Sequence, residues 1–142
     1  LLKRTGASVV LSSTWRLDGG ASYVERLLGL HGLRVRFVGV TPDGSRMRAS
    51  ARVTRGTEIA RWLQLGFVPA QSLAILDDEP SEEFGTLAPW HVATDFMRSG
   101  LLPEHVEIAV SLLGRDDRPA IIDAVSAQIE SAGLTHEGDR RG

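Results

Sequence analysis

Cysteine is absent from the 142 residues, which excludes disulfide scaffolds, cysteine nucleophiles and thiolate metal sites. An excess of either charge is also absent: 16 Lys and Arg against 18 Asp and Glu give a net charge of -2. This balance argues against a strongly basic nucleic-acid surface but allows a local basic patch. There is no apolar run near the roughly 20 residues that span a bilayer, and no signal-peptide pattern. We therefore expect a cytoplasmic globular protein.

The first six residues, LLKRTG, contain no Met and are typical of the last turn of a helix. Apolar residues come first, then two cations near the negative end of the helix dipole, then a glycine that stops the helix. We expect from this pattern that a further N-terminal segment precedes Leu1.

Short apolar runs alternate with amphipathic stretches along the rest of the chain. The runs predict buried strands at 7–11, 72–76 and 90–94 and an edge strand at 33–41. A 3.6-residue period predicts helices at 22–31, 56–65, 102–113 and 119–132. For the last two helices, the expected core faces are Val106, Ala109, Val110 and Leu113, and Ile122, Val125 and Ile129. Strands alternating with helices predict an α/β fold with a mainly parallel sheet.

Polar residues follow the predicted strands, at the edge where ligands bind in parallel α/β sheets. Hydroxyls and backbone N–H groups at Ser12-Ser13-Thr14 suit a phosphate oxygen, although local capping of the turn explains them too. The adjacent carboxylates Asp77 and Asp78 repel one another unless a cation such as Mg²⁺ lies between them. A solvated acidic loop is the alternative for this pair.

Arg55 precedes a predicted helix, and its guanidinium could make paired hydrogen bonds to a phosphoryl group. One more surface arginine is the alternative. Trp15 and Arg16 could extend a site toward a base or sugar, although Trp15 suits a core position better. The four histidines lack metal-ligand spacing, and no nucleophile elbow, P-loop or dinucleotide-binding motif occurs.

Four phrases in order resemble the haloacid dehalogenase-like (HAD) superfamily, and in detail the HAD domain of Swiss Army Knife RNA repair proteins. They are VVLSSTWR at 9–16, RGTEIARWL at 55–63, LAILDDE at 73–79 and HVATDFMRSGLLPEHVEIAVSLL at 91–113. The resemblance covers roughly residues 1–114 and implies a three-layer, Rossmann-like fold. Residues 115–142, a predicted helix and polar tail, lie outside it.

The resemblance implies Mg²⁺-dependent hydrolysis of a phosphomonoester. Ser12, with Ser13, would bind the phosphoryl group, Arg55 would neutralise its oxygens, and Asp77 and Asp78 would hold Mg²⁺. Asp95 lies in a family phrase without an assigned role. Kinship to RNA repair suggests the end phosphate of a polynucleotide as substrate. Five arginines could attract its backbone, or simply form a solvated basic loop: Arg34, Arg36, Arg46, Arg48 and Arg52.

The chain departs from the family at its first motif, D-x-D, which occurs nowhere in the 142 residues. In the family this motif ends the central strand of a sheet ordered 5-4-1-2-3, and it supplies the nucleophile. We therefore expect a sheet without its central strand, in a fragment that is inactive alone. The alternative is a complete, non-catalytic phosphate- or nucleotide-binding module. A two-component receiver is rejected, because its acidic pair would precede the hydroxyl.

Overall fold

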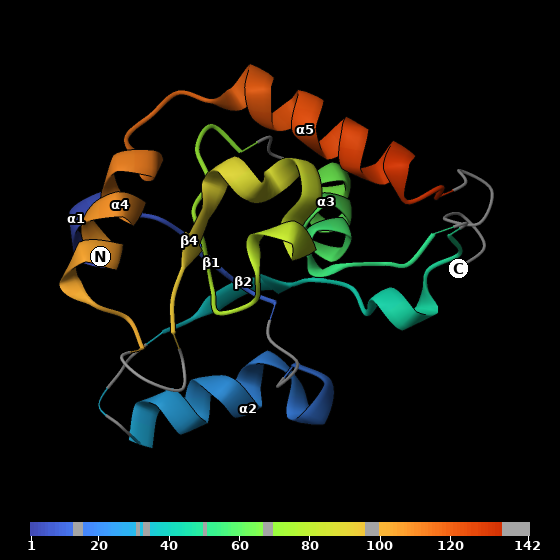
Figure 1. Cartoon of the computed structure of the whole chain (residues 1–142). Helices are drawn as coiled ribbons and strands as arrows, with labels where there is room; N and C mark the ends of the chain where they lie inside the picture. Colours follow the sequence, from blue (N-terminus) through green and yellow to red (C-terminus); the bar gives the residue numbers. More distant parts are fainter. Residues whose placement is uncertain are drawn as a thin grey trace.

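The computed structural model has the alternating helices and parallel strands that the sequence predicts (Figure 1). It describes residues 1–12, 16–30, 32, 35–49, 51–66, 70–95 and 100–134. The helices are α1 (Leu2–Thr5), α2 (Arg16–Leu30), α3 (Arg55–Leu65), α4 (Pro103–Leu113) and α5 (Arg118–Ser131), with 3-10 helices η1 (Gly44–Arg46) and η2 (Ser81–Trp90). The strands are β1 (Val9–Leu11), β2 (Phe37–Val40), β3 (Ile75–Asp77) and β4 (His91–Ala93).

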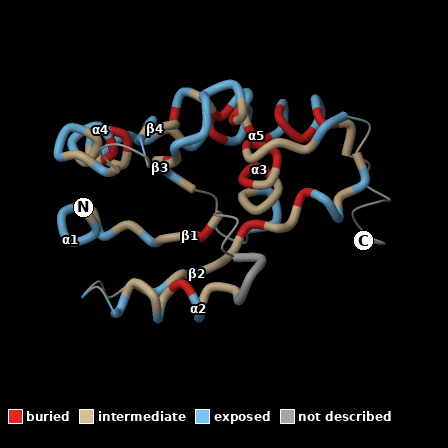
Figure 2. The backbone as a smooth tube through the Cα atoms, turned by 60° about the horizontal axis from the view of Figure 1, so that its bottom comes forward, coloured by how far each residue is buried: buried red, intermediate tan, exposed pale blue. Residues whose placement is uncertain are grey.

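The strands form two separate two-stranded parallel sheets. In one sheet β1 pairs with β2, Val10 lying opposite Gly39; in the other β3 pairs with β4, Leu76 lying opposite Val92. Among the described residues no strand pairing joins β1 to β3. Figure 2 shows the consequence: β1, β2 and α2 lie on one side of the molecule, and β3, β4 and α4 on the other. The parallel α/β class is confirmed, in two short parallel sheets.

The main core forms where α3, α5 and η2 pack together beside β3 and β4. Phe84 and Leu87 of η2 are fully buried there, with Ile59 of α3 and Val125 of α5. Gly56 lets α3 approach η2 closely, since a Cβ at this position would overlap the Phe84 carbonyl group. Helix α5 lies outside the stretch that resembles the family, yet it contributes directly to this core. Across the described ranges, no helix is both long and apolar enough to cross a bilayer.

The buried face of α5 matches the predicted one at Val125 and Ile129 and differs from it at Ile122. Ile122 is 49% exposed, whereas Ile121, Val125, Gln128 and Ile129 are buried. The buried positions and the predicted positions both follow a helical period, so residue spacing alone could not decide which set faces the core. In α4, Ala109 is buried as predicted and Val106, Val110 and Leu113 are half-buried, while Leu112, which was not predicted, is buried. Packing against the neighbouring elements sets the rotation of both helices.

Two further segments differ from the sequence prediction. Helix α2 begins at Arg16, before the start predicted at residue 22, and it contains a non-helical Gly20 with φ of 74° and ψ of -171°. Residues Ser81–Trp90 form the long 3-10 helix η2, which the sequence pattern did not predict, interrupted at Gly85 with φ of 54°. Glycine takes both conformations without the steric cost of a Cβ. The predicted tail from residue 135 onward lies outside the described residues.

Candidate functional site

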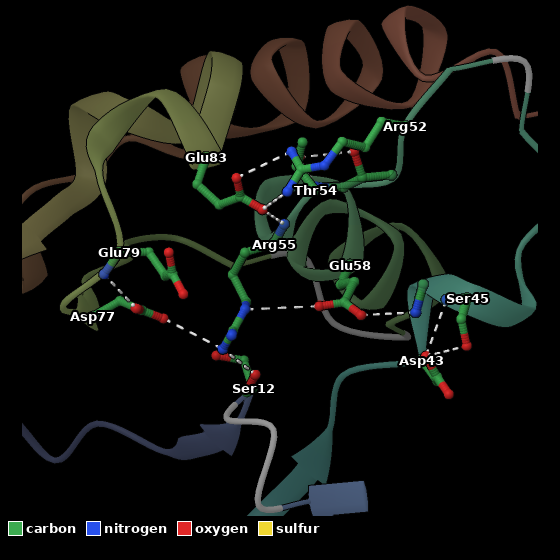
Figure 3. A network of polar contacts seen from close by, with 12 residues as sticks. Ser12, Asp43, Ser45, Arg52, Thr54, Arg55, Glu58, Asp77, Glu79 and Glu83 are labelled. Carbon is green, nitrogen blue, oxygen red and sulfur yellow. Dashed lines mark hydrogen bonds and ion pairs between the residues drawn. The ribbon is translucent and has the colours of Figure 1, made fainter.

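Arg55 is the meeting point of three segments that are distant in sequence. It is the first residue of α3, whose N-cap Thr54 accepts a hydrogen bond from the Thr57 backbone N–H. Its Nη1 donates to the Ser12 carbonyl oxygen at 2.5 Å and lies 3.5 Å from Asp77 Oδ2 (Figure 3). Ser12 follows β1 and Asp77 ends β3. One guanidinium therefore joins the carboxyl ends of the two sheets.

Further contacts hold Arg55 in place. Its Nε lies 3.8 Å from Glu58 Oε1, and the Glu58 Oε2 accepts from the Gly44 backbone N–H at 2.7 Å. The Arg55 backbone N–H donates to Glu83 Oε1 at 3.2 Å, and Glu83 also pairs with the guanidinium of Arg52 (Figure 3). The Arg55 side chain is only 13% exposed. The guanidinium is thus positioned before any ligand binds.

Charges around Arg55 favour a cation over a lone anion. The Arg55 guanidinium lies between the carboxylates of Asp77 and Glu58, whose side chains are 8% and 13% exposed. Asp78 adds another carboxylate directly after β3. Among the described side chains that pair with Arg55, two carboxylates outnumber the one guanidinium, so these groups alone would repel a lone phosphate dianion. A phosphate accompanied by a divalent cation would meet balanced charge.

Asp77 and Asp78 differ in how they are held. Asp77 Oδ1 accepts from the Glu79 backbone N–H at 2.9 Å, and the Asp77 carbonyl lies 3.0 Å from His91 Nε2. His91 Nδ1 in turn lies 3.0 Å from Ser81 Oγ. Asp78 is exposed and makes no hydrogen bond or ion pair with the rest of the described chain. The Asp77 carboxylate is therefore held in place by its contacts, whereas the Asp78 carboxylate has no such contacts within the described chain.

These donors fit one kind of metal site. No group of three or more His, Asp or Glu side chains within the described ranges could enclose a metal ion. Mg²⁺ needs no such cage, because it keeps several waters and binds through one or two carboxylates plus substrate phosphate. An ionised carboxylate has about four lone-pair sites, so Asp77 keeps acceptor capacity beside its existing contacts. Asp77 and Asp78 fit Mg²⁺ held in this way.

The structure brings Ser12, Arg55 and Asp77 together, with Asp78 next to them in sequence. Asp95 forms an isolated antiparallel bridge with Gly100. Other predicted residues lie outside the described residues or have undescribed side chains: Ser13, Thr14, Trp15, Arg16 and Arg34.

Sequence reasoning missed Glu58, Glu83 and His91. Glu58 had a usable signal, because it stands three residues after Arg55 on a predicted helix, where side chains are neighbours. Glu83 and His91 reach the site only through the packing of η2 and β4, so no local spacing indicates their contacts.

Comparison with protein families identifies the family to which this chain belongs. The model of the HAD domain in Swiss Army Knife RNA repair proteins matches residues 1–106. The chain belongs to this family. The match includes all three segments that meet at Arg55, so this HAD domain has a partial α/β HAD-like fold with its strand ends gathered at one site. No curated protein and no solved structure matches the chain.

Proposed function

We propose that this HAD domain binds a phosphate monoester together with Mg²⁺ and forms the electrostatic part of a phosphohydrolase site. The observation that carries the proposal is the Arg55 guanidinium, buried between Ser12 at the end of β1 and Asp77 at the end of β3. This arrangement places a hydroxyl-bearing residue, a fixed cation and a carboxylate at one edge of the sheets, where α/β proteins bind ligands.

Each residue has a distinct part in this proposal. Ser12 orients a phosphoryl oxygen, and Arg55 offsets the charge that grows on the phosphoryl group. Preorganised donors of this kind are worth about 3–4 kcal/mol each in other enzymes. Asp77 and Asp78 hold Mg²⁺, with Asp78 the more free to move toward it. Bound Mg²⁺ would add positive charge at the phosphoryl oxygens.

Covalent catalysis needs a nucleophile that these residues do not include. HAD-type hydrolysis passes through an aspartyl-phosphate on the D-x-D motif, and the 142 residues contain no D-x-D. We therefore propose that this chain binds phosphate but does not hydrolyse it without that motif. The same absence favours a second candidate function, a non-catalytic phosphate- or nucleotide-binding module. The upstream reading frame separates the two: a D-x-D after an apolar strand supports the enzyme, and a stop codon supports the module.

The proposed substrate class is the end phosphate of a polynucleotide. The family name supports it, as do the exposed arginines between β2 and α3: Arg46, Arg48 and Arg52. If these arginines contact backbone phosphates, binding of a 5′-phosphorylated oligoribonucleotide weakens as salt rises. Replacing Arg46 and Arg48 by Gln would flatten that dependence. An unchanged salt slope would leave a small phosphorylated metabolite as the better substrate.

Calorimetric titration with inorganic phosphate, with and without Mg²⁺, tests the proposed site. Binding should require Mg²⁺, and Arg55→Gln should weaken it about tenfold or more, because a charge-assisted hydrogen bond contributes about 1.5–3 kcal/mol. Arg118→Gln, the same change on exposed α5, is the matched control and should bind normally. Equal losses in both variants, or binding without Mg²⁺, would contradict the site. Turnover of p-nitrophenyl phosphate that Asp77→Asn abolishes would contradict the expected inactivity.

A further inference from the structure

One imidazole contacts both ends of the segment that carries Asp77 and Asp78. His91, the first residue of β4, lies opposite Ile75 in the parallel ladder, and its ring reaches along β3 to Asp77. The ring's Nε2 lies 3.0 Å from the Asp77 carbonyl oxygen, and its Nδ1 lies 3.0 Å from Ser81 Oγ. We call residues 77–81 the acidic loop. The His91 ring therefore bridges the first and last residues of this loop.

The chemistry of these contacts determines which ring nitrogen donates. A carbonyl oxygen can only accept, so His91 Nε2 carries a proton and donates it to Asp77. In the neutral ring Nδ1 then has an unshared lone pair, which accepts the Ser81 hydroxyl proton. One side chain thus supplies a donor to one end of the acidic loop and an acceptor to the other.

The ring that makes these two bonds is itself held by the core. It packs against Phe84 of η2 with the ring centroids 4.2 Å apart, and Phe84 is fully buried. The Asp77 carbonyl oxygen also accepts from the Thr94 backbone N–H at 3.0 Å. Within the loop, Asp77 Oδ1 accepts from the Glu79 backbone N–H at 2.9 Å (Figure 3). A loop that is ordered in this way before an ion binds loses less conformational entropy on binding.

We propose that His91 is a positioning residue for the acidic loop and holds Asp77 and Asp78 where their carboxylates can bind one divalent cation. This proposal rests on the proposed function, since it takes the acidic pair as Mg²⁺ ligands. Groups that hold the ligands of a metal orient them, and removing such a group typically weakens metal binding by about 10–100-fold. His91 acts through the backbone of the loop and is not a ligand itself.

Two replacements of His91 separate its hydrogen bonds from its ring. His91→Phe keeps a ring against Phe84 and loses both hydrogen bonds, whereas His91→Gln keeps a donor and an acceptor and loses the ring. Electron paramagnetic resonance of free Mn²⁺, added alone to the whole chain, measures the affinity of each variant. His91→Phe should weaken Mn²⁺ binding about tenfold, and His91→Gln should restore most of it. His105→Gln, the same change at a half-buried histidine on α4, is the matched control and should bind Mn²⁺ normally.

Hydrogen exchange at the Glu79 amide gives a second readout that needs no metal. This amide donates to Asp77 Oδ1, so its exchange rate reports how well the acidic loop is ordered. Exchange should be about threefold faster or more in His91→Phe and close to the original rate in His91→Gln. Ser81→Ala, at an exposed position, removes one of the two bridging bonds and should weaken Mn²⁺ binding about threefold. This last variant tests the bridge even where His91→Phe does not fold.

The results that would overturn the proposal differ from those that would overturn the proposed function. Normal Mn²⁺ binding in His91→Phe, or binding in His91→Gln no better than in His91→Phe, would assign His91 to packing alone. Equal weakening in His105→Gln would overturn the proposal as well. In each case the unchanged chain still binds Mn²⁺ and Asp77→Asn still loses it, so the proposed metal site stands. An unchanged chain that binds no Mn²⁺ would overturn both.

Discussion

The Arg55 guanidinium takes its position from groups on three segments: Ser12 after β1, Asp77 at the end of β3, and Glu58 one turn further along α3. Arginine suits this place because its planar fork donates in several fixed directions and stays charged at any ordinary pH. The two carboxylates around it differ from Asp78, which is exposed. At the residue scale, neighbouring aspartates of the same chemistry thus have different structural roles.

Replacing the two aspartates one at a time should separate these roles. Asp77→Asn weakens the contacts to Arg55 and to the Glu79 N–H, and should lower the free energy of unfolding by about 1–3 kcal/mol. Asp78→Asn, at an exposed position, should change it by no more than about 0.5 kcal/mol. Urea denaturation measures both. Equal destabilisation by the two variants would mean that Asp77 is not the fixed carboxylate.

At the scale of elements, a surface ion pair connects α1 to α4. Arg4 Nη1 lies 2.5 Å from Glu107 Oε1, and Arg4 Nη2 donates to Glu107 Oε2 at 3.3 Å. Both side chains are more than half exposed, so salt screens the pair and its contribution to stability is small. The hydrogen bond from Arg4, and then its charge, lower the pKa of Glu107 below its ordinary value.

The pH dependence of this pair has a definite sign. Because the Glu107 pKa is lower in the folded chain than in the unfolded chain, the stabilisation is present above the unfolded pKa and is lost as pH falls through the folded pKa. Arg4→Gln should return the Glu107 pKa toward its ordinary value. NMR titration of the Glu107 side chain measures it. A Glu107 pKa that is unchanged in Arg4→Gln would show that the two helices are not paired in solution.

A buried amide connects α5 to two other elements. Gln128 Nε2 donates to Thr57 Oγ1 on α3 at 3.0 Å, and Gln128 Oε1 accepts from the Thr86 backbone N–H on η2 at 3.0 Å. Gln128→Leu keeps the size but leaves both partners without this bond. It should lower the free energy of unfolding by about 1–3 kcal/mol, the cost of leaving one buried polar group unsatisfied, because Thr57 is buried whereas Thr86 is exposed.

Ile122→Ala on the same helix is the matched control. Ile122 is 49% exposed, so its truncation should cost far less than a core substitution. Chemical denaturation of the two variants compares them. A larger loss for Ile122→Ala than for Gln128→Leu would restore the core face that the sequence period predicted.

At the scale of the whole molecule, local patterns predicted the elements better than their contacts. The apolar runs marked β1, β3 and β4, and Gly6 ends α1 in the left-handed conformation expected of a helix-stopping glycine. These features depend on neighbours within a few residues. On α5, Val125 and Ile129 are buried as predicted, but Ile122 was wrong: Ile121 and Ile122 both fit a helical period, and only packing distinguishes them.

The candidate site, too, could be predicted only where local patterns determine it. Ser12 follows β1 and Asp77 ends β3, and the rule that parallel strands end at one edge brings them together. Glu83 and His91 come from η2 and β4, whose approach to the site is set by tertiary contacts that no spacing encodes. The functional roles of Ser12, Arg55, Asp77 and Asp78 stay predictions.

Crystals of the chain soaked with Mn²⁺ and tungstate test the central claim most directly. Mn²⁺ takes carboxylate ligands like Mg²⁺, and tungstate is a tetrahedral oxyanion like phosphate. The account predicts an anomalous manganese peak in contact with an oxygen of Asp77 or Asp78, and a tungsten peak within hydrogen-bond distance of both Ser12 and Arg55. Peaks at other surfaces with none at these residues, or tungstate bound at Arg55 without the metal, would contradict it.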